Sequence, residues 1–369
     1  MEMLVREHGL RVRVLAPHFG HCARVTRFRV ELCRGDLAAP DSLLRACQGV
    51  STVFHLAYSG GSAAANIDGA RNLGLAALAS GVRRFVHVST VSIYGETPPG
   101  SLDEAHRPGP ITDDYSATKA AVEKILLGLH REKGLPIAVL QPTIVYGPYG
   151  GPWTVRPLRQ LRDGRLVLPA DGRGICNAVY VDDVAEACLL AARSDRAVGQ
   201  RFLVSGPQPV TWADFYRAYE HMMPGINSVT LMDTADVREA MRRANDEKSL
   251  PVAMLAAVWR RPHIRDRILA VLPPLKWGYR GIRSALPPSL RSRMRRRLDP
   301  PWLEKDPSAA GLPPLVLPDL FLWKLYSSQS AVSIDKARRE LGYQPRFDLS
   351  RGMALTADWA RWAGLLTRA

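Results

Sequence analysis

The chain has 369 residues, which allows two domains or one large domain with an annex. Hydrophobic residues make up 46% and charged residues 23%, which excludes a wholly disordered chain. The five cysteines are scattered without a C-x-x-C pair or a metal-ligand spacing, so we expect no disulfide framework, no metal site and a reducing, cytoplasmic compartment. Because no run of 18 apolar residues and no signal-peptide core occurs, neither a membrane span nor secretion is expected.

The net charge is +15, and most of it comes from one segment. Residues 251–298 contain twelve basic residues and one acidic residue, so this segment carries +11. Its apolar residues Ile264, Ile268, Leu269 and Leu272 fall on one helical face, and aromatic residues are interleaved with the arginines. This composition predicts peripheral contact with an anionic membrane surface. The structural alternative is a solvated, proline-broken excursion, and nucleic-acid binding is not expected because no fold motif supports it.

Short β-branched runs alternate with segments of helical spacing through the first half of the chain. This alternation is typical of βαβ units and predicts an α/β fold with a parallel sheet. The expected strands are residues 11–15, 29–32, 52–57, 85–89, 137–140 and 200–204. The expected helices are residues 41–47, 66–80, 115–130 and 182–192, with another from 212. After residue 224 four Pro-Pro pairs break the pattern, and helical spacing returns at 333–341 and 352–362.

A tyrosine and a lysine four residues apart open one of the predicted helices. Tyr115 and Lys119 share a helix face, so the ammonium can lie near the phenol. A nearby cation lowers the pKa of a phenol from its ordinary value of about 10, which suits general acid–base catalysis. The pair alone is weak evidence, because exposed helix pairs of this kind occur by chance. Thr90 strengthens it, since a hydroxyl at the carboxyl end of a parallel strand stands where ligands bind in open α/β sheets.

Six or more short motifs follow one another in order along the chain. They are Gly35-Asp36-Leu37, Val53-Phe54-His55-Leu56-Ala57, Asn66 with Gly69, Phe85-Val86-His87-Val88-Ser89-Thr90, Tyr115 with Lys119, Pro142-Thr143-Ile144-Val145-Tyr146-Gly147-Pro148, Val179-Tyr180-Val181-Asp182-Asp183-Val184-Ala185 and Lys336-Ala337-Arg338-Arg339-Glu340-Leu341-Gly342-Tyr343-Gln344-Pro345. In this order the sequence resembles the extended short-chain dehydrogenase/reductase superfamily, in its NAD-dependent epimerase/dehydratase family. The resemblance covers about residues 3–220 and 331–362.

The resemblance implies a doubly wound parallel sheet of Rossmann-like type. The dinucleotide-binding domain would span residues 1–205, with excursions into the substrate domain after 145. A smaller substrate domain would span residues 206–369 and include the basic, proline-rich insert at about 251–301. The active site would lie between the two domains, and a homodimer is expected.

The resemblance also implies roles for individual residues. Tyr115 would be the acid–base residue, Lys119 would tune it and hold the nicotinamide ribose, and Thr90 would bind the substrate oxygen. The residues expected to contact NAD or NADP are Asp36, Leu37, Leu56, Ala57, Asn66, Tyr115, Lys119 and Pro142. For Asp36 the structural alternative is a turn aspartate, and for Asn66 it is a helix cap. Asp182 and Asp183 match a family motif, but we interpret them as structural caps of their helix.

The family's opening strand and its G-x-x-G-x-x-G turn are missing from this sequence. Residues 3–8 are interpreted as the tail of the first helix and residues 11–15 as the second strand. Since the missing strand is central in the 3-2-1-4-5-6 order, the strands on either side of it would lack a joining partner. Either the coding start is placed too late or the chain is a fragment or decayed paralogue. As written, the chain should bind a dinucleotide poorly.

The sequence does not decide between NAD and NADP or identify the substrate. Residues 15–18 contain no acid to take the ribose hydroxyl of NAD, which favours NADP with Arg24 or His18 as phosphate partner. Val91 and Ser92 stand where sugar dehydratases of the family have an Asp-Glu pair, so dehydration is disfavoured. What remains is redox chemistry or epimerisation at a secondary alcohol, with a nucleotide- or lipid-linked sugar favoured as substrate.

Two alternatives remain. Gln141 and Ile144 depart from the Arg and Asn of many nucleotide-sugar members, which leaves room for a 3β-hydroxysteroid-like dehydrogenase or ketone reductase acting on a lipid-like substrate. The non-enzyme alternative is a cofactor-less scaffold at a membrane surface.

Overall fold

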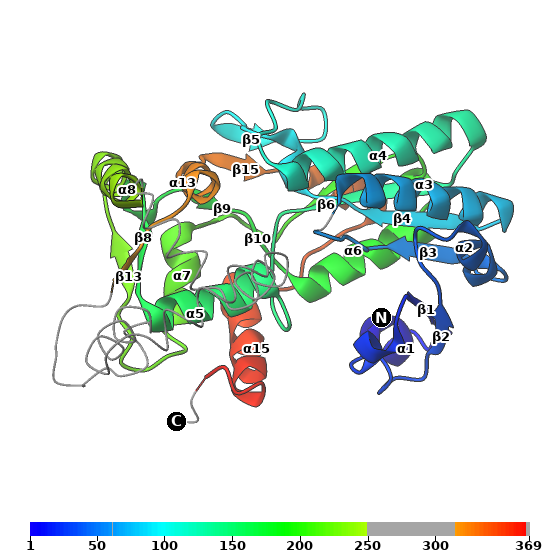
Figure 1. Cartoon of the computed structure of the whole chain (residues 1–369), viewed down its shortest axis with the longest axis horizontal. Coiled ribbons are helices and arrows are strands. Elements are labelled where there is room, and N and C mark those ends of the chain that lie inside the picture. The colour runs from blue at the N-terminus through cyan, green and yellow to red at the C-terminus, as the bar shows by residue number, and fades with distance from the viewer. Residues whose placement is uncertain (61, 249–313, 367–369) are drawn as a thin grey trace, which may run out of the picture. The chain divides into compact units, whose positions relative to one another are not determined.

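The computed structural model describes residues 1–60, 62–248 and 314–366 (Figure 1). They group into two compact units, Met1–Leu231 with Pro318–Ala369, and Met232–Leu317. The second unit contains the helix α8 (Thr234–Lys248) and the short strand β14 (Leu315–Val316). The division predicted after residue 205 stays a prediction. The basic segment 251–298 and the wider insert 251–301 lie outside the described residues, as does the membrane contact predicted for them.

A four-stranded parallel sheet forms the centre of the first unit. Its strand order is β11-β6-β4-β3, built from β3 (Thr52–His55), β4 (Arg84–Val88), β6 (Ile137–Pro142) and β11 (Arg201–Val204). Every residue of β6 is buried, which explains its continuous apolar run in place of an alternating one. All four strands were predicted from the sequence composition. The ends of the strands in the structure differ from the predicted ends by one to two residues.

Helices cover both faces of this sheet, with α3 (Ala63–Ala79) and α4 (Asp114–Lys133) on one face and α6 (Val181–Arg193) on the other (Figure 1). Alternate side chains of each strand point to opposite faces. Phe85 and Ile137 pack in a core with α3 and α4, whereas Val86 and Ala138 pack in a core with α6. The doubly wound arrangement predicted from the sequence is confirmed.

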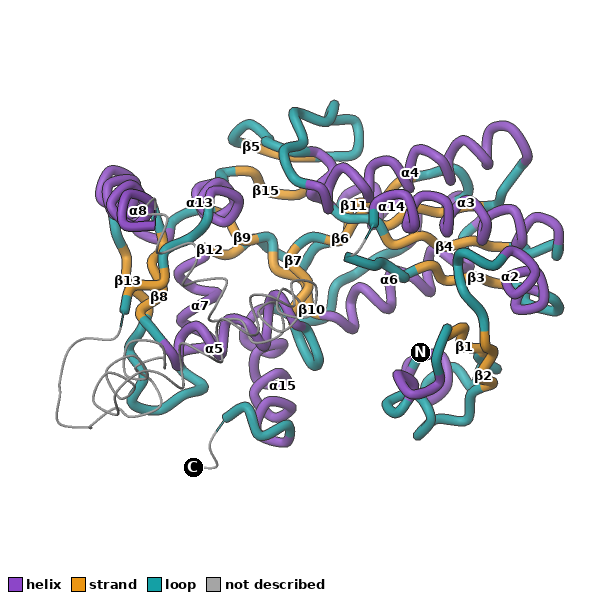
Figure 2. The backbone as a smooth tube through the Cα atoms, viewed as in Figure 1, coloured by secondary structure: helices purple, strands orange, loops and turns teal. Residues whose placement is uncertain are grey.

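The first two strands stand apart from this sheet. Strands β1 (Arg13–Ala16) and β2 (Glu31–Arg34) pair with each other in a parallel two-stranded sheet. Among the described residues, β3 ends the four-stranded sheet and no strand joins it to β1, as the tube in Figure 2 shows. The described strands of this region thus form two separate parallel sheets. The preceding short helix α1 (Glu2–Arg6) matches the predicted helix tail.

The remaining elements include several that the sequence did not predict. The short strand pairs are β7 (Ile144–Tyr146) with β10 (Ala178–Tyr180), β5 (Gly100–Leu102) with β15 (Ser330–Val332), β9 (Ile175–Cys176) with β12 (Val210–Thr211), and β8 (Arg165–Leu168) with β13 (Val229–Leu231). The remaining helices are α2 (Pro40–Cys47), α5 (Arg156–Asp163), α7 (Trp212–Glu220), α13 (Leu320–Ser327), α14 (Asp335–Leu341) and α15 (Leu349–Trp362). No helix in the described part of the chain is both long and apolar enough to cross a membrane.

A buried polar network ties α4 to the sheet. The amide nitrogen of Gln141 on β6 donates to both carboxylate oxygens of Glu123 on α4, at 3.1 and 3.2 Å. Its amide oxygen accepts from the Tyr94 hydroxyl at 2.9 Å, and Arg201 on β11 forms an ion pair with Glu123. Gln141 and Glu123 are almost completely buried, so each polar group depends on the others for a partner.

Replacing the central amide should therefore destabilise the domain. We expect Gln141→Leu to lower the free energy of unfolding by about 2–3 kcal/mol. The substitution leaves the Tyr94 hydroxyl without its hydrogen-bond acceptor and removes two hydrogen bonds to a buried carboxylate. Urea unfolding measures the change. The exposed Lys124→Gln on the same helix is the control and should stay within about 0.5 kcal/mol. A Gln141→Leu protein as stable as this control would show that the network contributes nothing.

Candidate active site

Thr90 lies just beyond the carboxyl end of β4, where it begins the short 3-10 helix η2 (Val91–Tyr94). Its hydroxyl accepts a hydrogen bond from the Ser92 amide at 3.2 Å and lies 3.1 Å from the Ser92 hydroxyl. The side chain is mostly buried, and these two contacts hold the oxygen in one position.

Tyr115 and Lys119 come from the first two turns of α4. Asp113 caps this helix by accepting a hydrogen bond from the Ser116 amide at 2.8 Å. The Tyr115 side chain lies close enough to Thr90 for the Thr90 side chain to act on its pKa, and the Lys119 ammonium donates to the Val88 carbonyl at 3.0 Å. The structure therefore brings the three predicted catalytic residues together, and their catalytic roles stay a prediction.

The protonation of this pair differs from the sequence-based expectation. Partial burial raises the pKa of Tyr115, which is still 41% exposed, and the Thr90 side chain opposes that rise. Burial also lowers the pKa of Lys119 to about 8. The expected lowering of the phenol pKa is therefore absent in this conformation.

The loop after β3 adds a residue that sequence reasoning missed. The ring of Tyr58 lies 5.0 Å from the ring of Tyr115, edge to face at 79°. The Lys119 ammonium lies 5.4 Å from the centroid of the same Tyr58 ring. The sequence feature that could have revealed Tyr58 is an aromatic residue three positions past the end of a parallel strand. Leu56 and Ala57, the predicted cofactor contacts, are exposed in this loop, which begins two residues earlier than the predicted strand end.

Asn66 supports the same loop from α3. Its side-chain oxygen accepts from the Ser59 amide at 2.8 Å, and its side-chain nitrogen donates to the carbonyls of Ser59 at 2.7 Å and Ser62 at 2.8 Å. Ser62 itself caps α3, so the helix-cap alternative for Asn66 is wrong. The predicted contact of Asn66 with the cofactor and its support of the site stay predictions.

Asp36 and Leu37 follow β2 and pack on α3. The Asp36 carboxylate accepts from the Ala38 amide at 2.9 Å, as a turn aspartate does. Gly69 lets Leu37 approach the helix, since a Cβ there would lie 2.7 Å from the Leu37 Cβ. The contacts of these two residues in the described structure reach α3 and the turn but not Tyr115 or Lys119. The last predicted cofactor contact, Pro142, is buried at the end of β6.

Two histidines lie on neighbouring strands near Lys119. His55 on β3 and His87 on β4 are directly opposite each other, with their Nδ1 atoms 3.1 Å apart. Burial first, and then the charge of Lys119, lowers the pKa of His55 to about 4. Burial, His55 and Lys119 lower the pKa of His87 as well. Both rings are therefore neutral at pH 7, and His87 Nε2 is buried without a hydrogen-bond partner.

Other residues singled out by the sequence have different partners. Asp183 does not cap its own helix: its carboxylate accepts from the backbone amides of Arg346 at 2.8 Å and Phe347 at 3.2 Å. This structural role comes from a long-range contact that no local pattern reveals. The Arg24 guanidinium lies over the Tyr149 ring at 4.2 Å.

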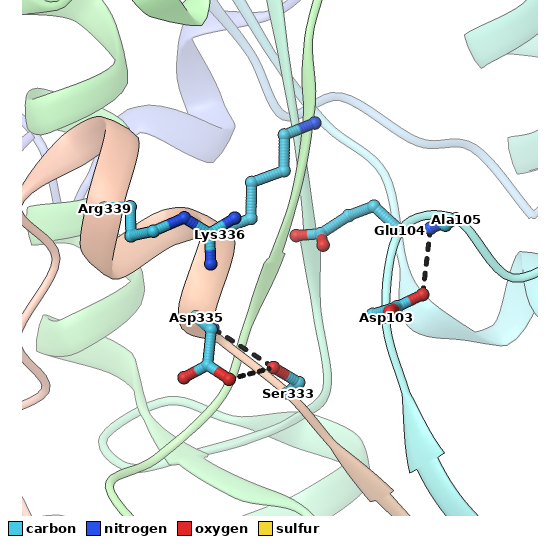
Figure 3. Close-up of a pocket in the computed structure, with 7 residues that line it drawn as sticks. All are labelled: Asp103, Glu104, Ala105, Ser333, Asp335, Lys336 and Arg339. Atoms are coloured by element: carbon cyan, nitrogen blue, oxygen red, sulfur yellow. Dashed lines mark hydrogen bonds between the residues drawn. The ribbon is translucent and has the colours of Figure 1, made fainter.

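A separate surface pocket contains none of the predicted site residues (Figure 3). Lys336 and Arg339 of α14 lie on one side of it, and Asp103 and Glu104 from the loop after β5 lie on the other. Glu104 accepts a hydrogen bond from the Leu203 amide at 2.7 Å and so covers the outer edge of β11. We interpret this pocket as a consequence of edge protection.

Comparison with known proteins agrees with this geometry. The model of the NAD dependent epimerase/dehydratase family matches residues 3–205. The chain belongs to this family.

Curated relatives of the family act on different substrate classes. A 2-alkyl-3-oxoalkanoate reductase of Stenotrophomonas maltophilia is 30% identical over 213 residues, covering 54% of this chain and 64% of the relative. A 3beta-hydroxysteroid-dehydrogenase/decarboxylase of Arabidopsis thaliana is 26% identical over 206 residues, covering 51% of this chain and 36% of the relative. The chain thus spans less than two thirds of the length of these relatives.

Solved structures confirm the fold. The UDP-glucuronic acid 4-epimerase of Bacillus cereus, in complex with UDP-glucuronic acid and NAD, is similar with a TM-score of 0.63. It is 17% identical, and the match covers 98% of this chain and 94% of that structure.

The described residues fit one end of the family's nicotinamide cofactor. The buried Lys119 ammonium, the Tyr115 phenol and the fixed Thr90 hydroxyl meet at the carboxyl ends of β3 and β4. These groups would suit a nicotinamide ribose and the reacting carbon of a substrate. The described strands include none that joins β1 to β3 in one sheet, where the family binds the pyrophosphate.

The buried histidines make stability depend on pH. As pH falls below about 6.5, the unfolded chain binds a proton at each histidine while folded His55 stays neutral down to a pKa of about 4. The contribution of neutral His55 to the free energy of unfolding is therefore fully present above about pH 6.5, and it is lost as the pH falls toward 4. We expect His55→Phe to reduce the loss of unfolding free energy between pH 7 and 4.5 by about 2–3 kcal/mol. Denaturant titrations at both pH values measure it, with the exposed His221→Gln as the unchanged control.

Proposed function

We propose that the chain carries the catalytic residues of an NAD(P)-dependent oxidoreductase or epimerase acting on a secondary alcohol or ketone, with a nucleotide- or lipid-linked sugar as the favoured substrate. The observation that carries this proposal is the convergence of Tyr115, Lys119 and Thr90: Thr90 acts on the pKa of Tyr115, the buried Lys119 donates to the Val88 carbonyl two residues before Thr90, and both Tyr115 and Lys119 contact the Tyr58 ring.

The proposed chemistry divides between the cofactor and the chain. When bound, the nicotinamide supplies the hydride acceptor or donor. Thr90 binds the substrate oxygen through its hydroxyl, which Ser92 holds in place. Tyr115 takes the hydroxyl proton as an alcohol becomes a ketone, and it returns that proton in the reverse direction. The Lys119 ammonium favours the anionic phenol while Tyr115 exchanges its proton with the substrate.

The substrate class rests on weaker support than the reaction class. The departure at Gln141 no longer argues against a nucleotide-sugar substrate. Its side chain is buried in the network with Glu123 and Tyr94, away from solvent. Ile144 remains as the departure from nucleotide-sugar members. A ketone reductase or 3β-hydroxysteroid-like dehydrogenase is the second candidate, favoured by the names of the two curated relatives. Release of reduced cofactor distinguishes an epimerase from a dehydrogenase, because an epimerase retains the reduced cofactor and a dehydrogenase releases it.

Substitutions at the site test the proposal. We expect Tyr115→Phe and Lys119→Met each to lower turnover by about 10²–10⁴-fold, because the proton transfer loses its acid or the charge that supports it. The assay measures reduced cofactor and substrate configuration at saturating cofactor, with UDP-sugars, 3-oxoalkanoates and 3-hydroxysteroids as substrates. Lys124→Gln, exposed on the same helix, should retain activity. Full activity in Tyr115→Phe would refute the assignment.

Cofactor affinity provides a separate test. We expect the chain Met1–Ala369 to bind NADH and NADPH more weakly than micromolar, because the described strands form no glycine-rich turn for the pyrophosphate. Fluorescence titration of either reduced cofactor measures this, and a family member with that turn is the positive control. Micromolar binding by this chain would contradict the expectation.

Two further expectations stay proposals. A homodimer and contact of segment 251–298 with an anionic membrane are both consistent with the family and the composition, and the second falls outside the described residues.

A further inference from the structure

One aromatic ring contacts both members of the proposed catalytic pair. The Tyr58 ring meets the ring of Tyr115 edge to face, 5.0 Å away, and the Lys119 ammonium lies 5.4 Å from its centroid. The side chain is 40% exposed, so part of its surface is toward solvent while the rest contacts the pair. Lys119 is only 5% exposed whereas Tyr115 is itself 41% exposed, so the Tyr58 ring stands between bulk water and the ammonium but does not cover the phenol.

The backbone next to Tyr58 is held firmly. Ser59 exchanges two hydrogen bonds with the side chain of Asn66, at 2.7 and 2.8 Å. Asn66 is itself buried on α3, and its third bond goes to the Ser62 carbonyl at 2.8 Å. On the other side, β3 ends at His55, paired with His87. A short loop anchored at both ends limits where the Tyr58 ring can lie.

We propose that Tyr58 is a positioning residue that shields the Lys119 ammonium from water and holds the Tyr115 ring on the Thr90 side of the site. The inference rests on the proposed function, since it takes Tyr115 and Lys119 to be the working pair. It adds a third residue to the site, one that touches both groups from a different element of the fold.

The electrostatics of the pair agree with shielding. Burial is the largest cause of the raised pKa of Tyr115 and of the lowered pKa of Lys119. The groups that face Lys119 are the Val88 carbonyl and the neutral His55 and His87, and those that face Tyr115 are Thr90, Asp113 and Tyr58 itself.

Two effects of the Tyr58 ring on Lys119 have opposite signs. Exclusion of water disfavours the ammonium, whereas the attraction between the ammonium and the ring face favours it. If shielding dominates, loss of the ring raises the pKa of Lys119. If the attraction dominates, loss of the ring lowers it. The direction of the change therefore decides between the two.

The test compares Tyr58→Ala with Tyr58→Phe in the full chain, without cofactor or substrate. Carbon-13 signals of labelled lysine and tyrosine side chains report the pKa values, assigned with Lys119→Met and Tyr115→Phe. We expect Tyr58→Ala to raise the pKa of Lys119 by about one unit from about 8, and to leave that of Tyr115 nearly unchanged because Tyr115 is already 41% exposed. Tyr58→Phe keeps the ring and should leave both close to wild type.

Tyr149→Ala is the matched control, because Tyr149 is 39% exposed and contacts Arg24 and Trp359. It should change neither pKa. If Tyr58→Ala fails to fold, Tyr58→Ser gives the same comparison. An unchanged or lowered pKa of Lys119 in the alanine or serine variant would overturn the shielding role.

Activity separates this inference from the proposed function. Shielding predicts that Tyr58→Ala moves the pH profile of turnover while Tyr58→Phe does not. If the pKa of Lys119 rises but Tyr115→Phe retains full turnover, the shielding stands and the proposed function fails. If Tyr115→Phe is inactive and the pKa of Lys119 does not rise, the proposed function stands and the shielding fails.

Discussion

The hydrogen bonds of strand β4 to its two neighbours hold the candidate site together. On one side β4 pairs with β3, whose following loop carries Tyr58, and on the other it pairs with β6, whose Gln141 anchors α4. Beyond its own end β4 leads directly to Thr90, and its last carbonyl, that of Val88, receives the Lys119 ammonium. A shift of one residue in this parallel register would move all of these groups at once.

The same strand shows how the fold tolerates polar groups in its interior. Alternate residues Phe85 and His87 face the helices α3 and α4, so an imidazole occupies a position where the pattern favours an apolar side chain. The pairing with His55 satisfies one nitrogen of each ring, and both rings stay neutral beside a buried ammonium. Burial near the site thus favours neutral forms in general, which brings Lys119 close to its titration range at ordinary pH.

Local sequence patterns predicted the central sheet and the three converging residues because both depend on short-range regularities. The apolar run of β6 and the four-residue spacing of Tyr115 and Lys119 are visible in the sequence itself. The partners of Asp183 and Gln141 are not, because they lie 163 and 18 residues away. Tyr58 was missed because its importance depends on where the loop turns after β3. The strand appeared two residues longer in the sequence than in the structure, which hid the loop.

The separation of β1 and β2 from the main sheet affects how the two halves of the domain respond to thermal fluctuation. Two parallel strands of four residues bury little surface and share few hydrogen bonds, so they can open at a small cost in free energy. The strands that carry Thr90 and support Tyr58 lie in a sheet covered on both faces and open only with the whole core. In hydrogen exchange, the amides of residues 13–34 would therefore lose protection well before those of β4 and β6.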